Sequence, residues 1–177
     1  IGRLVGSEMC IRDSLKRALM TAAVPIEGGR ILRVANTHLS AFSRGDGTLA
    51  KQVAALRAWM EAQPTDQPWI LAGDFNLLPP GDTPGRLSTE SDLYADATNP
   101  IEALLPGFQE AFGDPLAPAA RTYQPFGAAG PDRKIDYIFY GGPLAIEHAE
   151  VIHSDLSDHL PLSLIHISEP TRRPIIS

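Results

Sequence analysis

The chain has 177 residues, of which 15 are lysine or arginine and 21 are aspartate or glutamate, so its formal net charge at pH 7 is −6. This length supports one hydrophobic core rather than two domains, and the acidic balance counts against a strongly basic surface for nucleic acid. A single cysteine excludes an intramolecular disulfide framework, and no apolar run reaches the roughly 20 residues that a membrane-spanning helix needs.

The two ends of the chain differ in character from the rest. Residues 1–14 and 162–177 can be encoded by complementary strands of one DNA sequence, which resembles a transposase-type sequencing adapter. Unrelated protein ends are not expected to be complementary in this way. We therefore predict that both segments are adapter-derived and that residues 15–161 are the natural sequence. The two ends should form no consistent core, and should either lie free or add strand edges.

The first part of the natural sequence predicts two strands and a helix. Residues 15–26 and 30–39 flank the sequence EGG at 27–29, which favours a hairpin with a tight turn. Residues 46–63 predict an amphipathic helix. Its apolar positions recur at steps of three or four residues, and they are Leu49, Val53, Leu56 and Met60.

The second part alternates strands with long loops. The apolar run 68–76 predicts a buried strand that ends in polar residues, and 133–142 and 144–154 show the alternation typical of strands. Residues 90–109 are weakly helical, and 115–133 form a long loop rich in proline, glycine and alanine. Strands with one amphipathic helix between them indicate an α/β layered domain.

Four polar clusters each fall at the end of a predicted strand, and they are NTHL, GDFN, KIDYI and SDHLP. Aspartate and histidine are expensive to bury unless they are paired or bound to a cation, so we expect these clusters to converge on one rim of a sheet. The oxygen ligands suit Mg²⁺, Mn²⁺ or Ca²⁺ rather than zinc, and the histidines suit proton transfer. The residues concerned are Asp74, Asn76, Asp136, Asp158, His38 and His159.

The motifs NTHL, GDFN, IDYIF and SDHLP, in this order and with a helix after the first, resemble the endonuclease/exonuclease/phosphatase superfamily. That superfamily includes pancreatic-type deoxyribonucleases, AP endonucleases, inositol polyphosphate phosphatases and neutral sphingomyelinases. The resemblance covers nearly all of residues 15–161. It implies the C-terminal portion of a two-sheet α/β sandwich, truncated at its N-terminal half and its final strand. It also implies a phosphodiesterase-like or nuclease-like hydrolase of phosphate esters that uses Mg²⁺ or Mn²⁺.

The resemblance assigns roles to the residues of the first two motifs. His38 is similar to the histidine that contacts the scissile phosphate and protonates the leaving oxygen. Asp74 resembles the carboxylate that orients or deprotonates the attacking water. Asn76 resembles the asparagine that hydrogen-bonds the phosphate. The implied metal ligands are Asp74, Asn76 and Asp158.

The last two motifs supply the remaining implied roles. Asp136 is similar to the aspartate that orients the histidine corresponding to His38. Asp158 resembles a metal-associated carboxylate that also pairs with His159, the candidate general base or phosphate ligand. Beside these motifs, Arg44 lies in the loop after the first one and is a candidate contact for the substrate phosphate.

One part of the family pattern has no counterpart in this sequence. The family carries an early asparagine and a glutamate that is its principal metal ligand, and Glu27, placed in an apparent hairpin turn, is a poor substitute. We therefore predict that this chain alone is nearly inactive. The expected partner is a phosphate ester, in nucleic acid, in a phospholipid or as a small molecule, without an obligate protein partner. The cytoplasm is favoured as the compartment.

Other interpretations of the same residues stay open at this stage. The domain could keep the family fold only for binding, or act as a phosphomonoesterase or a sphingomyelinase-type enzyme. His38 could be a satisfied core histidine, and Asp74 could cap the loop that follows it. Asp136 could pair with Arg133 or Lys134 at a strand edge.

Overall fold

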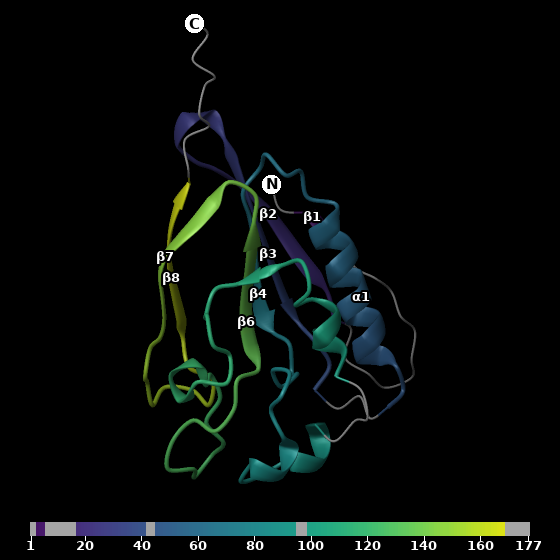
Figure 1. Cartoon of the computed structure of the whole chain (residues 1–177), viewed down its shortest axis with the longest axis vertical. Coiled ribbons are helices and arrows are strands. Elements are labelled where there is room, and N and C mark those ends of the chain that lie inside the picture. Colours follow the sequence, from purple (N-terminus) through teal and green to yellow (C-terminus); the bar gives the residue numbers. More distant parts are fainter. Residues whose placement is uncertain (1–2, 6–16, 42–44, 95–98, 169–177) are drawn as a thin grey trace, which may run out of the picture.

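The computed structural model describes residues 3–5, 17–41, 45–94 and 99–168. Within these ranges it contains a mixed sheet of six strands, in the order β1-β2-β3-β4-β6-β5, and a second sheet of two strands, β7 and β8 (Figure 1). The strands are β1 (Arg3–Val5), β2 (Leu19–Pro25), β3 (Ile31–His38), β4 (Trp69–Asp74), β5 (Gln109–Glu110), β6 (Asp136–Gly141), β7 (Leu144–Val151) and β8 (Leu162–Ser168).

One long helix and several short 3₁₀ turns connect the strands. The helix α1 (Thr48–Glu61) follows β3, as the apolar periodicity predicts. Gly47 is the N-cap residue, and Oδ1 of the preceding Asp46 accepts a hydrogen bond of 2.8 Å from the backbone N–H of Thr48. In the weakly helical region, the described residues form the 3₁₀ turns Ser91–Tyr94 and Pro100–Ala103 instead of an α-helix. Among the described helices, none is both long and apolar enough to cross a membrane.

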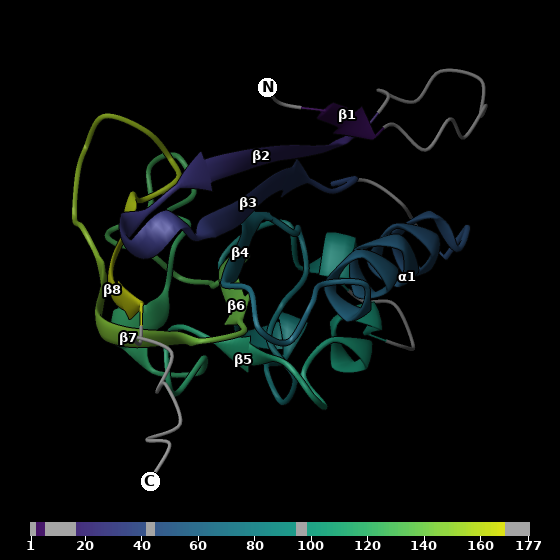
Figure 2. The same cartoon turned by 90° about the horizontal axis from the view of Figure 1, so that it is seen from above.

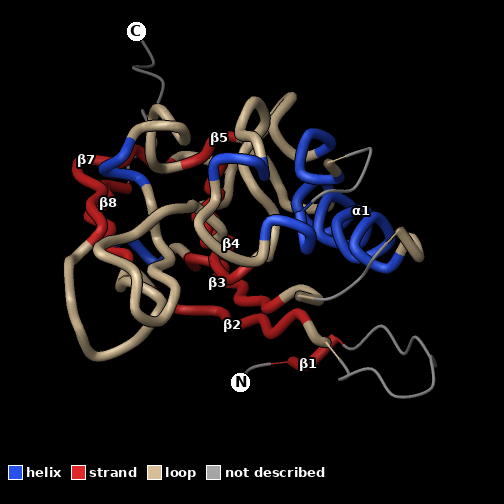
Figure 3. The backbone as a smooth tube through the Cα atoms, turned by 90° about the horizontal axis from the view of Figure 1, so that it is seen from below, coloured by secondary structure: helices blue, strands red, loops and turns tan. Residues whose placement is uncertain are grey.

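The pairing of β3, β4 and β6 brings one end of each of these strands to the same rim of the large sheet. The predicted hairpin is confirmed, since β2 and β3 are antiparallel. β3 and β4 are parallel, whereas β4 and β6 are antiparallel. The C-terminal ends of β3 and β4 therefore lie beside the N-terminal end of β6. Figure 3 looks at the molecule from this end, where long loops gather.

The helix α1 covers one face of the large sheet (Figure 2). The predicted stripe is buried, and it packs in one cluster with residues of β3, β4 and β6, among them Ala35, Leu71, Tyr137 and Phe139. Each large apolar side chain buried in this way stabilises the fold by about 1.5–3 kcal/mol relative to its exposed state. Because α1 directly follows β3 and directly precedes β4, this packing also holds the two strands side by side.

The sheet of β7 and β8 covers the opposite face (Figure 2). Successive side chains of β6 point to opposite faces, so Tyr137 and Phe139 face α1 while Ile138 faces β7 and β8. Partly buried residues from both sheets pack around Ile138, and they include Ile70, Ala72, Val151, Leu162 and Leu164. The predicted two-sheet α/β sandwich is confirmed.

The C-terminal segment corrects one expectation. Residues 162–168 pair with β7 along their whole length, from Val151 opposite Leu162 to Leu144 opposite Ser168. The expectation that the ends add strand edges is confirmed for residues 3–5 and 162–168, which pair with β2 and β7. The expectation that they make no core is wrong for Leu162 and Leu164, because the alternation of a strand turns both toward Ile138. The adapter origin of both ends stays a prediction. Residues 1–2, 6–14 and 169–177 lie outside the described residues.

Gly73 leaves no room for a side chain between β4 and β3. A Cβ atom at this position would lie 2.0 Å from the backbone oxygen of Thr37 on β3, and its φ is +155°. A Gly73→Ala variant is therefore expected to lose about 3 kcal/mol of unfolding free energy, because β3 and β4 must move apart. Urea titration followed by circular dichroism measures this loss. Gly85→Ala is the control, since nothing lies within 4 Å of its added Cβ, and equal losses in both variants would contradict the prediction.

Candidate active site

Three candidate residues lie next to one another across the sheet. In the parallel pair, His38 at the end of β3 is opposite Asp74 at the end of β4. In the antiparallel pair, Asp74 is opposite Asp136 at the start of β6. The three positions thus stand at one level on three neighbouring strands. The prediction that these strand ends meet on one rim is confirmed.

The GDFN motif forms a tight turn that fixes the carboxylate of Asp74. One oxygen, Oδ1, accepts a hydrogen bond of 2.8 Å from the backbone N–H of Asn76, and the other, Oδ2, accepts one of 3.1 Å from its Nδ2. The same Nδ2 donates to the backbone oxygen of Leu39 at 3.1 Å. Asn76 has φ of +51°, a left-handed conformation that asparagine tolerates. Asp74 therefore caps its own loop and also stands in the site.

The imidazole of His38 stands at the open side of the site. Its Nε2 lies 3.2 Å from Oδ2 of Asp74, and 55% of its side chain is exposed, against 13% for Asp74. This exposure rules out the interpretation of His38 as a core histidine. A ligand approaching the rim can reach the imidazole without displacing any core residue.

His159 reaches the same site from the far end of the sequence. Its Nδ1 lies 3.0 Å from Oδ2 and 3.2 Å from Oδ1 of Asp136, and its Nε2 lies 3.8 Å from Oδ2 of Asp74. The fully buried Thr122 holds this arrangement, because its Oγ1 accepts from the backbone N–H groups of Ile135 and Asp136, at 3.1 Å each. Its backbone oxygen accepts from Leu160 at 2.7 Å.

Two predicted pairings are corrected by these contacts. Asp136 was expected to orient His38, but its carboxylate contacts His159, while His38 contacts Asp74. Asp158 was expected to pair with His159, but its side chain is exposed and its Oδ1 accepts from Ser157 at 3.2 Å. Asp158 lies in a bend of the loop after β7, and the bridge to Tyr123 that follows it places His159 beside Asp136.

Three further residues were predicted to belong to the site, and they are Asn76, Asp158 and Arg44. Asn76 contacts Asp74 directly, as stated above. The metal role of Asp158 stays a prediction. Arg44 lies outside the described residues, so its proposed contact with the phosphate stays a prediction too.

Burial and mutual charge shape the electrostatics of the site. Burial raises the pKa of Asp74 and the negative charge of Asp136 raises it further, against the opposing effects of the Asn76 N–H and the two histidines. The hydrogen bond to Asp136 raises the pKa of His159, although burial alone would lower it. Two carboxylates therefore share a cleft in which a positive charge is favoured.

A group of three side chains has the geometry of a cation site. Ligand atoms of Asp74, Asp136 and His159 all lie within 4.8 Å of one another. Carboxylate oxygens suit Mg²⁺ and Mn²⁺, and the imidazole adds a nitrogen ligand that suits softer divalent ions. This group shares only Asp74 with the predicted set, because the structure places Asp136 rather than Asp158 beside it.

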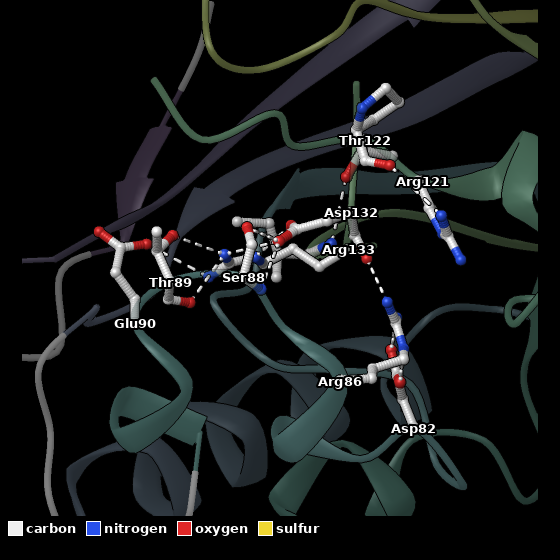
Figure 4. A network of polar contacts seen from close by, with 11 residues as sticks. Asp82, Arg86, Ser88, Thr89, Glu90, Arg121, Thr122, Asp132 and Arg133 are labelled. Carbon is white, nitrogen blue, oxygen red and sulfur yellow. Dashed lines mark hydrogen bonds and ion pairs between the residues drawn. The ribbon is translucent and has the colours of Figure 1, made fainter. Parts of the chain in front are cut away.

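Sequence reasoning assigned no role in the site to Arg133, a buried arginine in a network of polar contacts (Figure 4). Its side chain has no exposed surface, and each guanidinium nitrogen donates to a neighbouring loop. Nε donates to Asp132 at 2.7 Å, Nη1 to Glu90 at 3.2 Å and Nη2 to the backbone oxygen of Thr89 at 3.0 Å. The alternative pairing of Asp136 with Arg133 or Lys134 is therefore wrong, since Lys134 Nζ lies 3.3 Å from Glu110.

The contact between Asp132 and Arg133 should make the stability of the folded protein depend on pH in the acidic range. Burial alone would raise the pKa of Asp132, but the hydrogen bond and charge of Arg133 lower it below the ordinary value of 3.8. A carboxylate with a lowered pKa stabilises the fold above pH 3.8, and this contribution disappears as the pH falls through the lowered pKa. Asp132→Asn should therefore cost about 2 kcal/mol at pH 7.

The measurement is urea unfolding of both proteins at a series of pH values. The difference between Asp132→Asn and the unchanged chain should shrink as the pH falls below 3.8. Asp66→Asn is the control, since Asp66 is exposed. A difference that stays constant over the whole pH range would contradict a role for the Asp132 charge.

Comparisons with known proteins agree with this arrangement. The model of the Endonuclease/Exonuclease/phosphatase family matches residues 8–159. A UPF0294 protein of Yersinia pseudotuberculosis is 30% identical over 149 residues, which are 84% of this chain and 47% of that protein. This chain therefore spans about half the length of the curated relatives it matches.

Two solved structures show the same fold at low sequence identity. The D. rerio TDP2 structure, complexed with single strand DNA product, has a TM-score of 0.61 and 17% identity, over 94% of this chain and 67% of that one. The mannosyl-6-phosphatase of Bacteroides thetaiotaomicron has a TM-score of 0.57 and 15% identity, over 89% and 59%. At these identities the likeness concerns the fold alone.

Proposed function

The chain belongs to the endonuclease/exonuclease/phosphatase family, and we propose that its parent protein is a hydrolase of phosphate esters that depends on Mg²⁺ or Mn²⁺. The observation that carries this proposal is the meeting of two carboxylates and two histidines on one rim of the sheet. The contacts are His38 with Asp74 at 3.2 Å and His159 with Asp136 at 3.0 Å. Acids and bases in contact within one cleft are what hydrolysis of a phosphate ester requires.

Each side chain has a task in this proposal. Asp74 and Asp136 would hold the divalent cation, with His159 as a third ligand or as the base that takes a proton from water. A bound cation supplies charge neutralisation at the phosphate oxygens. The exposed His38 would donate a proton to the leaving oxygen. Asn76, held in the turn after Asp74, would hydrogen-bond the phosphate. Asp158 remains a candidate metal ligand, and Arg44 a candidate contact for the phosphate.

The proposed substrate is a phosphodiester, with a phosphomonoester as the second candidate. D. rerio TDP2 was solved with single strand DNA product, and a Bacteroides relative in fold is a mannosyl-6-phosphatase, so this fold occurs with both kinds of ester. The acidic charge of this chain favours a small or single-stranded substrate over duplex DNA. A binding domain without catalysis is the alternative from another class.

We also propose that the site is completed by residues outside this chain. The described cluster holds two carboxylates and one imidazole, whereas Mg²⁺ prefers six oxygen ligands, several of them water. The resemblance implies a glutamate as the principal ligand, and this chain matches only 47% of its Yersinia relative. The chain by itself should therefore bind the cation weakly and turn over slowly.

The test compares this chain with a longer protein that includes the sequence preceding it in the gene. We expect the longer protein to hydrolyse bis-p-nitrophenyl phosphate with Mg²⁺ or Mn²⁺ and to lose this activity in EDTA. We expect the chain alone to be slower by more than about tenfold, which is about 1.4 kcal/mol in the barrier. Activity that survives EDTA, or no activity in the longer protein, would overturn the proposed function. Equal activity of the two proteins would overturn only the proposal of an incomplete site.

A further inference from the structure

The ring of Tyr123 lies between Arg133 and the candidate catalytic histidine. Its centroid is 5.0 Å from that of the His159 imidazole, with an angle of 67° between the two planes, an edge-to-face contact. The Cζ atom of Arg133 lies 5.1 Å from the centroid of the same ring, and 5.3 Å from that of Tyr94. The guanidinium therefore makes cation–π contacts with both tyrosine rings, and of these two rings Tyr123 is the one that contacts the imidazole of His159.

The backbone of Tyr123 is tied to the same two residues. Its N–H donates to the backbone oxygen of Arg133 at 3.0 Å, and its own oxygen accepts from Asp132 at 3.0 Å. Isolated β-bridges pair Tyr123 with Arg133 and with His159. Backbone pairing and ring contacts thus both link Arg133 to Tyr123 and Tyr123 to His159. A shift of the Tyr123 segment must displace His159.

Arg133 is held by hydrogen bonds from each of its guanidinium nitrogens. Its fully buried guanidinium donates to Asp132, Glu90 and Thr89, on two separate segments (Figure 4). A buried ion pair is often no more stabilising than an apolar side chain of similar volume. A planar, delocalised cation differs in another respect, because it fixes the aromatic rings stacked on its faces.

We propose that Arg133 is a positioning residue for His159, acting through the ring of Tyr123. The imidazole is held on one side by Asp136, at 3.0 Å from its Nδ1, and on another by the edge-to-face contact with Tyr123. Asp136 fixes one ring nitrogen, and Tyr123 limits rotation about the side-chain bonds. The Nε2 atom is thereby kept facing Asp74, at 3.8 Å from its Oδ2, on the side where a substrate phosphate would bind. This role rests on the proposed function, in which His159 acts on the substrate or its cation.

The test uses four variants of the chain and of the longer protein. Arg133→Met removes the cation, Tyr123→Leu removes the ring, and Tyr123→Phe keeps it. Arg86→Met is the matched control, because Arg86 belongs to the same network through Asp82 and the backbone oxygen of Asp132. Two-dimensional NMR of the chain measures the nuclear Overhauser contact between the rings of residue 123 and His159. Steady-state kinetics of the longer protein gives kcat and KM.

We expect Arg133→Met and Tyr123→Leu to lose the ring contact and to lower kcat by about 10- to 100-fold, with KM changed less than about twofold. Tyr123→Phe and Arg86→Met should keep the contact, and Tyr123→Phe should keep kcat. If Arg133→Met does not fold, the comparison of Tyr123→Leu with Tyr123→Phe decides. Retention of the contact in Arg133→Met, or an equal loss of kcat in Arg86→Met, would overturn the proposal. If the unmodified longer protein is inactive, the proposed function fails, and the NMR contact still decides the positioning role.

Discussion

An Asp74→Asn variant of the longer protein is expected to lose about 10³-fold in kcat/KM, which corresponds to about 4 kcal/mol in the barrier. Asp74 has three contacts in the site that depend on its charge. Its Oδ2 lies 3.2 Å from His38 and 3.8 Å from His159, and it is one of the three candidate cation ligands. An amide keeps the shape of the side chain and removes the charge, so all three contacts weaken together.

The same variant should not lose stability to a comparable extent. Burial and the charge of Asp136 both raise the pKa of Asp74, so its ionised form is held at a cost in the folded protein. We expect the unfolding free energy of the metal-free chain to change by less than about 1 kcal/mol. Asp66→Asn, on the exposed surface, is the control for both measurements. A loss of activity that is matched by a loss of folded structure would contradict a catalytic role.

A His159→Gln variant is the second change with a large expected effect. Glutamine can still donate a hydrogen bond toward Asp136, but it cannot exchange a proton near neutral pH. Loss of one general acid or base typically costs 10²- to 10⁴-fold, so we expect kcat to fall by about 10³-fold. The measurement is again hydrolysis of bis-p-nitrophenyl phosphate by the longer protein with Mg²⁺ or Mn²⁺.

The matched control for His159 is another histidine of the same chain. His148 on β7 is exposed, and its Nε2 lies 3.5 Å from Glu150, so it also pairs with a carboxylate. His148→Gln should leave kcat within about twofold of the unmodified protein, since exposed pairs contribute little. Equal effects of the two substitutions would refute a specific role for His159. Retained activity in His159→Gln would leave His38 as the histidine that carries the chemistry.

Local sequence patterns determined the long helix and the main strands of this protein. The step of three and four residues between Leu49, Val53, Leu56 and Met60 predicted α1, because a helix with one apolar stripe must bury that stripe. The alternation in 133–142 predicted a strand with two different faces, and Tyr137 and Ile138 do lie on opposite sides of the sheet. These are short-range properties, which adjacent residues fix among themselves.

The polar ends of the strands also determined which residues meet. His38 is the last residue of β3, Asp74 is the last of β4 and Asp136 is the first of β6, and the pairing of the strands places the three opposite one another. Sequence spacing could not determine which carboxylate serves which histidine. That choice depends on the path of the loop after β7. The backbone oxygen of Thr122, which is 37 residues before His159 in the sequence, holds this loop in place.

Arg133 shows most clearly what only the tertiary structure decided. From the sequence, an arginine beside a lysine at the start of a strand indicates an exposed, solvated pair. In the fold both are buried, since Glu90 and Thr89, more than forty residues earlier, accept hydrogen bonds from Arg133, and Glu110 forms an ion pair with Lys134. Pairing over such a distance leaves no periodicity in the sequence. The motifs therefore revealed the chemistry of the rim, whereas the contacts that hold it in place arose only when distant segments packed together.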